Sequence, residues 1–203
     1  SVVRSHFPLP LNFYLFMAYH CKSPVLFHLW NRIDVVKRTF RQIQIARPSK
    51  LYLSSDGAKN LNDKKKIVLI RRYVEKNINW KCKVHKIYFK RNLGPKFALS
   101  NSINKVFFRE KKLIVIEHDC LCDNTFFRFM DELLELYENE TKIKLISGNY
   151  ICKNQLSFDH SYYFAQHPIT HGWATWQRSW KEYDINMKNY NNIKYFFWLL
   201  FFF

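Results

Sequence analysis

The sequence predicts an α/β fold with one central, mostly parallel sheet and helices on both of its faces. Short apolar runs alternate with stretches whose apolar residues recur at helical spacing, in the order β-α-β-α-β-α-β-α-β. The apolar runs also lack a strict alternation with polar residues, which is typical of parallel strands covered on both faces. The 203 residues are enough for one sizeable domain with its own core.

Five apolar runs are the expected strands, each bounded by turn-forming or polar residues. They are 24–30 (PVLFHLW), 50–57 (KLYLSSDG), 83–90 (KVHKIYFK), 112–119 (KLIVIEHD) and 142–148 (KIKLISG). The first strand is bounded by Pro24 and Asn31, and the second ends in an expected turn at Asp56-Gly57. Together these runs supply the strands of the predicted sheet.

Four stretches between these runs have the apolar periodicity of amphipathic helices. They are 34–46, with Asp34 as the expected N-cap; Asn62 or Asp63 to about Ile78; from Pro95 through Phe107; and 125–140. Proline suits the first position of a helix, which supports the third assignment. Residues 149–171 are expected to be irregular or antiparallel, and 172–180 (GWATWQRSW) to open a further helix.

The chain is strongly basic, with 33 Lys+Arg against 16 Asp+Glu and a formal net charge of +17. Such an excess suggests an anionic partner: nucleic acid, an acidic membrane surface or a phosphorylated ligand. An AT-rich coding bias explains it equally well, since the lysines are spread along the chain with one tight run at Lys64–Lys66. No RNA-binding aromatic motif or basic helix is present, so no nucleic-acid partner is expected. Peripheral association with an anionic membrane stays open.

The five cysteines have neither zinc-site nor disulfide-framework spacing, which favours reduced thiols and a cytoplasmic setting. Residues 1–21 are expected to be an N-terminal extension, with Met17 as the favoured start, and 22–184 to be the domain. Residues 185–203 form an atypical aromatic tail, at which the domain is expected to be truncated. The last nine residues, YFFWLLFFF, are about half of the ~20 apolar residues that span a bilayer. A cut-off membrane helix, a buried element and a reading-frame accident all remain open.

Groups that can carry charge or bind a ligand follow the expected strands. The carboxyl ends of parallel strands share one edge of a sheet, and open α/β sheets bind ligands in the crevice there. The residues at this edge are Asn31-Arg32, Asp56-Gly57, Arg91-Asn92-Leu93-Gly94 and Glu117-His118-Asp119. Four strand ends with polar or glycine residues together predict a binding site.

The chemistry of these residues suits a metal-bound diphosphate. A carboxylate such as Asp119, flanked by the acid Glu117, can hold Mg²⁺ or Mn²⁺ through one or two oxygens and leave the other positions to phosphates and water. Arg32 and Arg91 could hydrogen-bond phosphate oxygens. Glycines such as Gly57 would let a ligand approach the backbone closely.

The chain resembles the nucleotide-diphospho-sugar transferases of GT-A fold. The nearest likeness is to bacterial family 2-like transferases, and a more distant one is to the N-acetylglucosaminyltransferase I group. Five stretches carry the resemblance: PVLFHLWNR (24–32), KLYLSSDG (50–57), KRNLGPK (90–96), IVIEHDC (114–120) with TFFRF (125–129), and SYYFAQHPITHGWATWQRSW (161–180). The resemblance implies a metal-dependent glycosyltransferase that moves a sugar from a nucleotide-diphosphate donor, with UDP expected, to a glycan or lipid-linked acceptor, with inversion.

The resemblance also implies a role for each matching residue. Asp119 would be the ligand of a divalent metal, Mn²⁺ or Mg²⁺, and Glu117 and His118 would lie near the ribose and donor sugar. The remaining roles are a uracil contact for Asp56, the nucleotide pocket for Asn31 and Arg32, the diphosphate border for Arg91, Asn92 and Gly94, and a wall towards donor sugar or acceptor for His171, Gly172 and Trp173.

The sequence departs from the family pattern in two places. His118 stands where the family usually has aspartate, and no acid follows Asp184, where inverting relatives place a catalytic carboxylate. The catalytic residue is therefore unknown, with Asp159, His171 and Asp184 as the nearby substitutes. Two alternatives stay open: an inactive transferase fragment, and a basic module that binds nucleic acid or a membrane surface.

Overall fold

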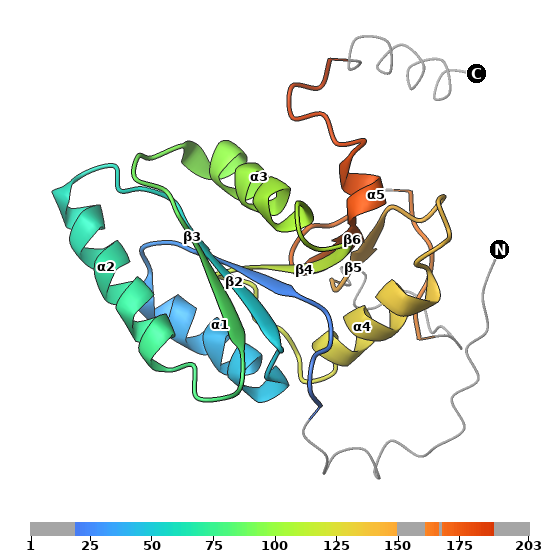
Figure 1. Cartoon of the computed structure of the whole chain (residues 1–203), viewed down its shortest axis with the longest axis horizontal. Coiled ribbons are helices and arrows are strands. Elements are labelled where there is room, and N and C mark those ends of the chain that lie inside the picture. Colours follow the sequence, from blue (N-terminus) through green and yellow to red (C-terminus); the bar gives the residue numbers. More distant parts are fainter. Residues whose placement is uncertain (1–18, 150–160, 167, 189–203) are drawn as a thin grey trace, which may run out of the picture.

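The computed structural model describes residues 19–149, 161–166 and 168–188. The expectations for residues 1–18, Asp159 and residues 189–203 lie outside this part. The described part holds six strands and five helices (Figure 1). In chain order they are β1 (Val25–Leu29), α1 (Ile33–Ala46), β2 (Lys50–Ser55), α2 (Leu61–Lys76), β3 (Lys83–Tyr88), α3 (Gly94–Phe107), β4 (Lys112–Glu117), α4 (Phe126–Leu136), β5 (Leu145–Ser147), β6 (Trp173–Trp176) and α5 (Gln177–Trp180).

The six strands form one sheet in the order β3-β2-β1-β4-β6-β5. Strands β3, β2, β1 and β4 are parallel, and β6 runs antiparallel to both of its neighbours. The chain winds outward from β1 to β3 and then crosses back to place β4 beside β1. The predicted α/β class with a mostly parallel sheet is confirmed, and the β1–β4 boundary is the point where the strand order reverses.

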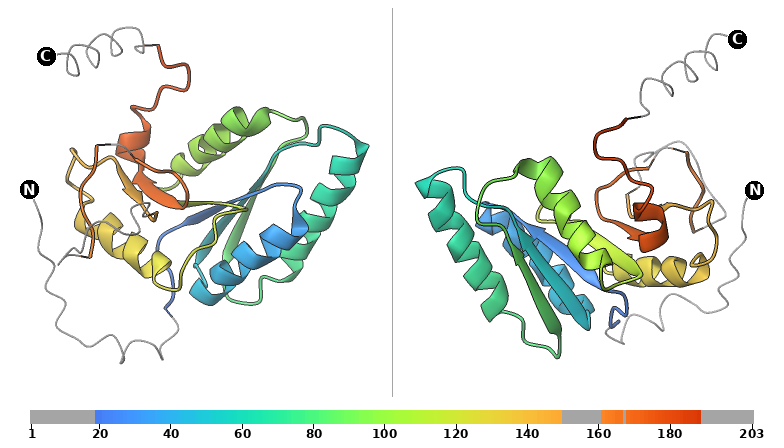
Figure 2. Two further views of the ribbon diagram at one scale, coloured as in Figure 1. Left: turned by 180° about the vertical axis from the view of Figure 1, so that it is seen from behind. Right: turned by 45° about the horizontal axis from the view of Figure 1, so that its top comes forward.

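Helices cover both faces of the sheet, as predicted (Figure 2). On one face α1, α2 and α4 pack over a large apolar cluster that includes Phe27 and Phe40. On the other face α3 packs over a smaller cluster that includes Leu26 and Trp173. All five residues of β1 are buried because its two sides meet different helix layers. Burying each large apolar side chain contributes about 1.5–3 kcal/mol, so this central strand is a main source of stability.

The expected helix at residues 172–180 is wrong for its first half. Residues 173–176 (WATW) form the fully buried strand β6, which pairs with β4 and β5 through Ala174. The expected fifth strand shortens to Leu145–Ser147 and pairs with β6. Residues 112–115 of β4 pair with WATW on one side and β5 pairs with it on the other, and this pairing outweighs the helical spacing of Trp176 and Trp180.

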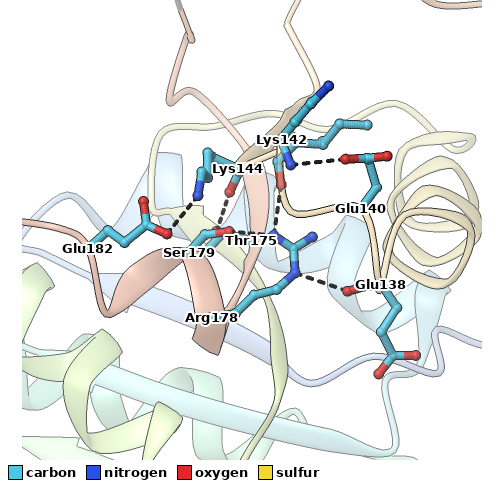
Figure 3. Close-up of polar contacts among 9 residues, drawn as sticks. Glu138, Glu140, Lys142, Lys144, Thr175, Arg178, Ser179 and Glu182 are labelled. Atoms are coloured by element: carbon cyan, nitrogen blue, oxygen red, sulfur yellow. Dashed lines mark hydrogen bonds and ion pairs between the residues drawn. The ribbon is translucent and has the colours of Figure 1, made fainter.

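Arg178 of the short helix α5 fastens this helix to the end of α4 (Figure 3). Its guanidinium donates hydrogen bonds to the carbonyl oxygens of Tyr137, Glu138 and Ile143, each at 2.9 Å. The same group lies 4.3 Å from the Trp176 ring centroid. These carbonyls belong to the segment that follows α4 and leads to β5. The contacts of Arg178 hold the β5–β6 half of the sheet against α4.

Helix ends differ from the expectations by a few residues. The N-cap position of α1 is Arg32, and Asp34 lies inside the first turn. There its negative charge interacts favourably with the positive end of the helix dipole. Helix α2 begins earlier than expected because the Asn60 side chain accepts a hydrogen bond from the Asp63 backbone at 2.9 Å. Helix α4 ends at Leu136 instead of residue 140.

Two further findings bear on the setting of the protein. Within the described ranges, no helix is long and apolar enough to cross a bilayer. The four cysteines that these ranges contain are free thiols: Cys21, Cys82, Cys120 and Cys122.

Candidate functional site

The predicted site residues converge at the carboxyl edge of the sheet. In the sheet register, His28 of β1 lies opposite Ser54 of β2 on one side and Glu117 of β4 on the other. The segments that follow these three strands therefore begin side by side. This places Asn31, Asp56 and Glu117 at one edge of the sheet, where the strand order reverses; open α/β sheets bind ligands in a crevice at such an edge.

Asp56 at the end of β2 is buried, with 3% of its surface exposed. Its Oδ1 accepts hydrogen bonds from the backbone N–H of Gly57 at 2.7 Å and of Leu93 at 2.9 Å. Its Oδ2 accepts from the Asn92 side chain and the Gly94 backbone N–H, both at 2.9 Å. A carboxylate offers about four acceptor positions, and these four bonds use them. Asp56 therefore anchors the loop between β3 and α3, and its predicted contact with uracil would require one of these bonds to open.

Gly57 is required by the chain itself. A Cβ atom on Gly57 would overlap the backbone of Arg91. Gly94 differs, because open space surrounds the position of its Cβ while its φ of +78° lies in the left-handed region that favours glycine. The sequence predicts that Gly57 lets a ligand approach the backbone closely. In the structure it lets the backbone of Arg91 approach instead. The Arg91 side chain stays exposed at this border.

Asp119, beyond the end of β4, has the opposite character. Its side chain is 48% exposed, and its Oδ2 lies 3.8 Å from Arg32 Nη2 and 3.9 Å from His118 Nε2. Contacts this long and this exposed contribute little to stability. The Asp119 carboxylate is therefore open to a ligand.

The two residues before Asp119 are half-buried. Burial raises the pKa of Glu117, the charge of Asp119 raises it further, and His171 opposes the shift. Burial lowers the pKa of His118, so its imidazole is neutral near pH 7. The His118 carbonyl accepts a hydrogen bond from Thr39 at 2.8 Å, while its buried Nδ1 has no partner among the described residues. His171, expected in the far wall, thus lies within electrostatic reach of the acidic end of β4.

The donor set at this rim fits one kind of metal binding. In the part of the chain that the structure describes, no group of three or more His, Cys, Asp or Glu side chains is arranged to hold a metal ion. Asp119, with the neutral imidazole of His118 beside it, offers one or two ligands. Mg²⁺ and Mn²⁺ accept such sparse protein ligation when phosphate oxygens and water fill the other positions. The residues therefore fit a metal that binds together with a diphosphate, and they do not fit a closed protein cage.

Asn31 and Arg32 border a hollow of about 280 Å³ between α1 and α2. The Asn31 side chain donates to Asp63 Oδ1 at 2.7 Å and so ties the end of β1 to the start of α2. Arg32 is exposed and faces Asp119. The structure thus places Arg32 in the crevice and gives Asn31 a bond within the chain.

A larger cavity of about 490 Å³ lies between α3 and the β5–β6–α5 region. Trp173 and Trp180 line it, with their ring centroids 6.2 Å apart, and Lys96 and Glu182 stand among its polar lining. Trp173 itself is buried, and Gly172 before it has a φ of +68°. Of the expected wall at 171–173, Trp173 lines this cavity, and His171 acts on Glu117 at the end of β4.

Sequence reasoning missed His28 and two serines near it, Ser54 and Ser102, which form a row of buried hydrogen bonds with it. His28 is buried in β1, and burial, with a further effect of His118, lowers its pKa to about 4. The available signal was the polar residue within the apolar run PVLFHLW. A polar group there must find a partner inside the fold.

No family model matches the chain, and no curated protein matches it. Among solved structures it is similar to a mannosyltransferase from Pyrobaculum calidifontis in complex with GDP-Man and Mn²⁺ (TM-score 0.45, 12% identity, 64% of this chain and 35% of that chain). It is also similar to glucosyl-3-phosphoglycerate synthase from Mycobacterium tuberculosis in complex with Mn²⁺, UDP and glucosyl-3-phosphoglycerate (TM-score 0.46, 11% identity, 77% of this chain and 57% of that chain). A third similar structure is 4-diphosphocytidyl-2C-methyl-D-erythritol synthase from Anaerococcus prevotii (TM-score 0.49, 10% identity, 87% of this chain and 83% of that chain).

The chain thus spans about a third and just over half of the length of the first two proteins. At 10–12% identity and TM-scores below 0.5, these similarities carry no conclusion about the activity of this chain. The chemistry of this chain has to come from its own residues.

Proposed function

We propose that the chain is the nucleotide-binding part of a glycosyltransferase that uses a nucleotide-diphosphate sugar, with UDP as the nucleotide and a divalent metal. The observation that carries the proposal is the exposed carboxylate of Asp119 beside Arg32, at the carboxyl end of β4, where the strand order of the sheet reverses. An exposed acid and an exposed arginine at this position suit a metal-bound diphosphate better than they suit a packing role.

In this proposal the residues around the crevice divide the work. Asp119 would hold the metal, with His118 as a neighbouring neutral ligand or hydrogen-bonding group, and a metal held there would supply positive charge to a leaving diphosphate. The guanidinium of Arg32 donates to phosphate oxygens. The loop at 91–94, fixed by Asp56, borders the donor and needs no reordering when the donor binds.

The acceptor, a glycan or lipid-linked hydroxyl compound, approaches from the side of His171 and the larger cavity. Aromatic rings such as Trp180 and polar groups such as Lys96 line that cavity, which suits a sugar with an apolar face and hydroxyl edges. The catalytic base stays unassigned. Asp184 is a poor candidate because its carboxylate accepts backbone hydrogen bonds from Asn186 at 2.9 Å and Lys188 at 2.7 Å in a surface turn.

Calorimetric titration of UDP into the protein with Mn²⁺, with Mg²⁺ and with a chelator tests the proposal. We expect binding that requires the metal, and we expect Asp119→Asn to weaken it at least about tenfold, as loss of a charged ligand contact should. Glu138→Gln is the matched control, since this exposed acid lies beyond the end of α4. Equal binding with and without metal would remove the role of Asp119. Binding of UDP-sugars without any turnover would favour an inactive transferase fragment.

A further inference from the structure

A chain of hydrogen bonds runs from the floor of the crevice into α3. His28 Nδ1 lies 2.9 Å from Ser54 Oγ, and Ser54 Oγ lies 2.6 Å from Ser102 Oγ. Ser102 Oγ donates to the carbonyl oxygen of Ala98 at 2.7 Å. All three side chains are buried, and His28 is 6% exposed. The chain links β1, β2 and α3 directly below the strand ends.

The direction of these bonds fixes the tautomer of His28. A carbonyl oxygen only accepts, so the single hydroxyl proton of Ser102 is used on Ala98. Ser54 must then donate its own proton to Ser102. With that proton used, Ser54 can only accept from His28, so His28 carries its proton on Nδ1. The other ring nitrogen, Nε2, is left with a bare lone pair.

Nε2 of His28 is available to a ligand. It forms no hydrogen bond within the described ranges, and His28 keeps 6% of its surface exposed. The charges that act on the ring, besides its burial, come from His118 and Asp56, both at the carboxyl edge of the sheet. Because the carboxylate of Asp56 is fully engaged, His28 is the free acceptor next to it.

We propose that Nε2 of His28 is a specificity-determining acceptor that binds the imide N–H of a uracil base in the crevice. This inference rests on the proposed function and moves base recognition from Asp56 to His28. Uracil presents a ring N–H at the position where cytosine presents a bare nitrogen. A fixed acceptor therefore attracts the first base and repels the second. Ser54 and Ser102 are positioning residues, because they act only through the tautomer of His28.

The first test compares UDP and CDP by calorimetry with Mn²⁺. We expect wild-type protein to prefer UDP by about tenfold, the scale of one hydrogen bond plus the repulsion of its mismatch. His28→Phe keeps an aromatic ring and leaves the Ser54–Ser102 bond in place, and it should bring the two affinities within about threefold of each other. Equal affinities in wild-type protein, or an unchanged preference in His28→Phe, would overturn the inference.

The second test reads the tautomer and does not depend on that variant. Nitrogen-15 spectra of the full chain should show His28 protonated at Nδ1 in the wild type. Ser102→Ala leaves Ser54 free to turn its proton to Nδ1, so the ring should move its proton to Nε2 and the preference for UDP should fall or reverse. A wild-type spectrum with the proton on Nε2 would overturn the inference even if His28→Phe fails to fold. Failure of wild-type protein to bind either nucleotide would instead contradict the proposed function.

Discussion

The ends of β2 and β4 carry the same residue type at the same edge of the sheet, yet Asp56 and Asp119 differ in every physical respect. Asp56 is 3% exposed and accepts four hydrogen bonds from its own chain. Asp119 is 48% exposed, and among the described residues its carboxylate meets two charged or imidazole groups, Arg32 and His118, at 3.8 and 3.9 Å. An acid at a strand end is therefore free for a ligand only if no neighbouring loop uses its oxygens.

The difference arises because a second backbone segment packs against the end of β2 and none packs in the same way against the end of β4 in the described part of the chain. Gly57 has no side chain, so the backbone at Arg91 can lie directly against it, and this brings the N–H groups of Leu93 and Gly94 to Asp56. After β4 the nearest backbone contact is a local turn, in which Cys120 N–H donates to the Glu117 carbonyl at 3.0 Å. No loop covers Asp119 in the same way among the described residues.

The largest expected effect comes from removing the buried member of this pair. Asp56→Ala leaves the N–H groups of Leu93 and Gly94 and the Asn92 amide without their acceptor, and we expect a loss of about 3–5 kcal/mol in the free energy of unfolding. Urea unfolding followed by circular dichroism measures it. A loss below about 1 kcal/mol would mean that water replaces the carboxylate and that Asp56 is free to serve a ligand.

Gly57→Ala should be the next most damaging change. The added methyl group overlaps the backbone of Arg91, which cannot move without breaking the bonds to Asp56, so we expect a loss of about 2–3 kcal/mol. Gly94→Ala is the control, because its Cβ meets open space and only its φ of +78° opposes the change, at about 1 kcal/mol. Thermal unfolding of both variants should rank them in this order, and the reverse rank would contradict the fixed loop.

Acid should lower the stability of the protein through His28, which lies buried in β1. His28 has a pKa of about 4 in the folded protein, below its usual value of 6.5. Between these two pH values the unfolded chain therefore binds a proton at this residue and the folded chain does not. Stability should be level above pH 6.5 and fall towards pH 4, by on the order of 3 kcal/mol. His118 acts in the same direction. The urea midpoint of unfolding should depend less on pH in His28→Phe than in the wild type. An equally steep fall in the variant would show that another group causes the loss of stability.

The smallest expected effect on stability comes from the exposed member of the pair. Asp119→Asn should change the free energy of unfolding by less than about 0.5 kcal/mol, because its contacts to Arg32 and His118 are long and exposed to solvent. The same variant should weaken metal-dependent UDP binding at least about tenfold. A large stability loss in Asp119→Asn would show that the two acids are alike and that the distinction between them is wrong.

The parallel half of the fold could be predicted because its signals are local. Buried strands such as 113–116 are continuous apolar runs, and the helices between them show their own periodicity. Strand β6 could not be predicted, because Trp176 and Trp180 have helical spacing and only pairing with β4 and β5 makes WATW a strand. Strand order, and hence the place of β6 between them, depends on residues far apart in the sequence.

The candidate site shows the same division. The residues at the rim could be predicted from strand ends alone, and the structure brings them to one edge. Their division into anchors and ligand-binding groups could not, because the bonds that Asp56 accepts from residues 92–94 join positions 36 to 38 residues apart. The role of His28 depends on serines 26 and 74 positions away, and only the fold brings Ser54 and Ser102 together.

The position of β6 bears on how the chain is synthesised. Strand β4 is complete at Glu117, but the neighbour that closes its outer edge begins only at Trp173. A nascent chain on the ribosome therefore exposes an apolar strand edge while more than fifty further residues are translated. Shortened expression versions that stop before residue 173 should be recovered mainly as aggregates, whereas versions that include Trp176 and Arg178 should stay in solution.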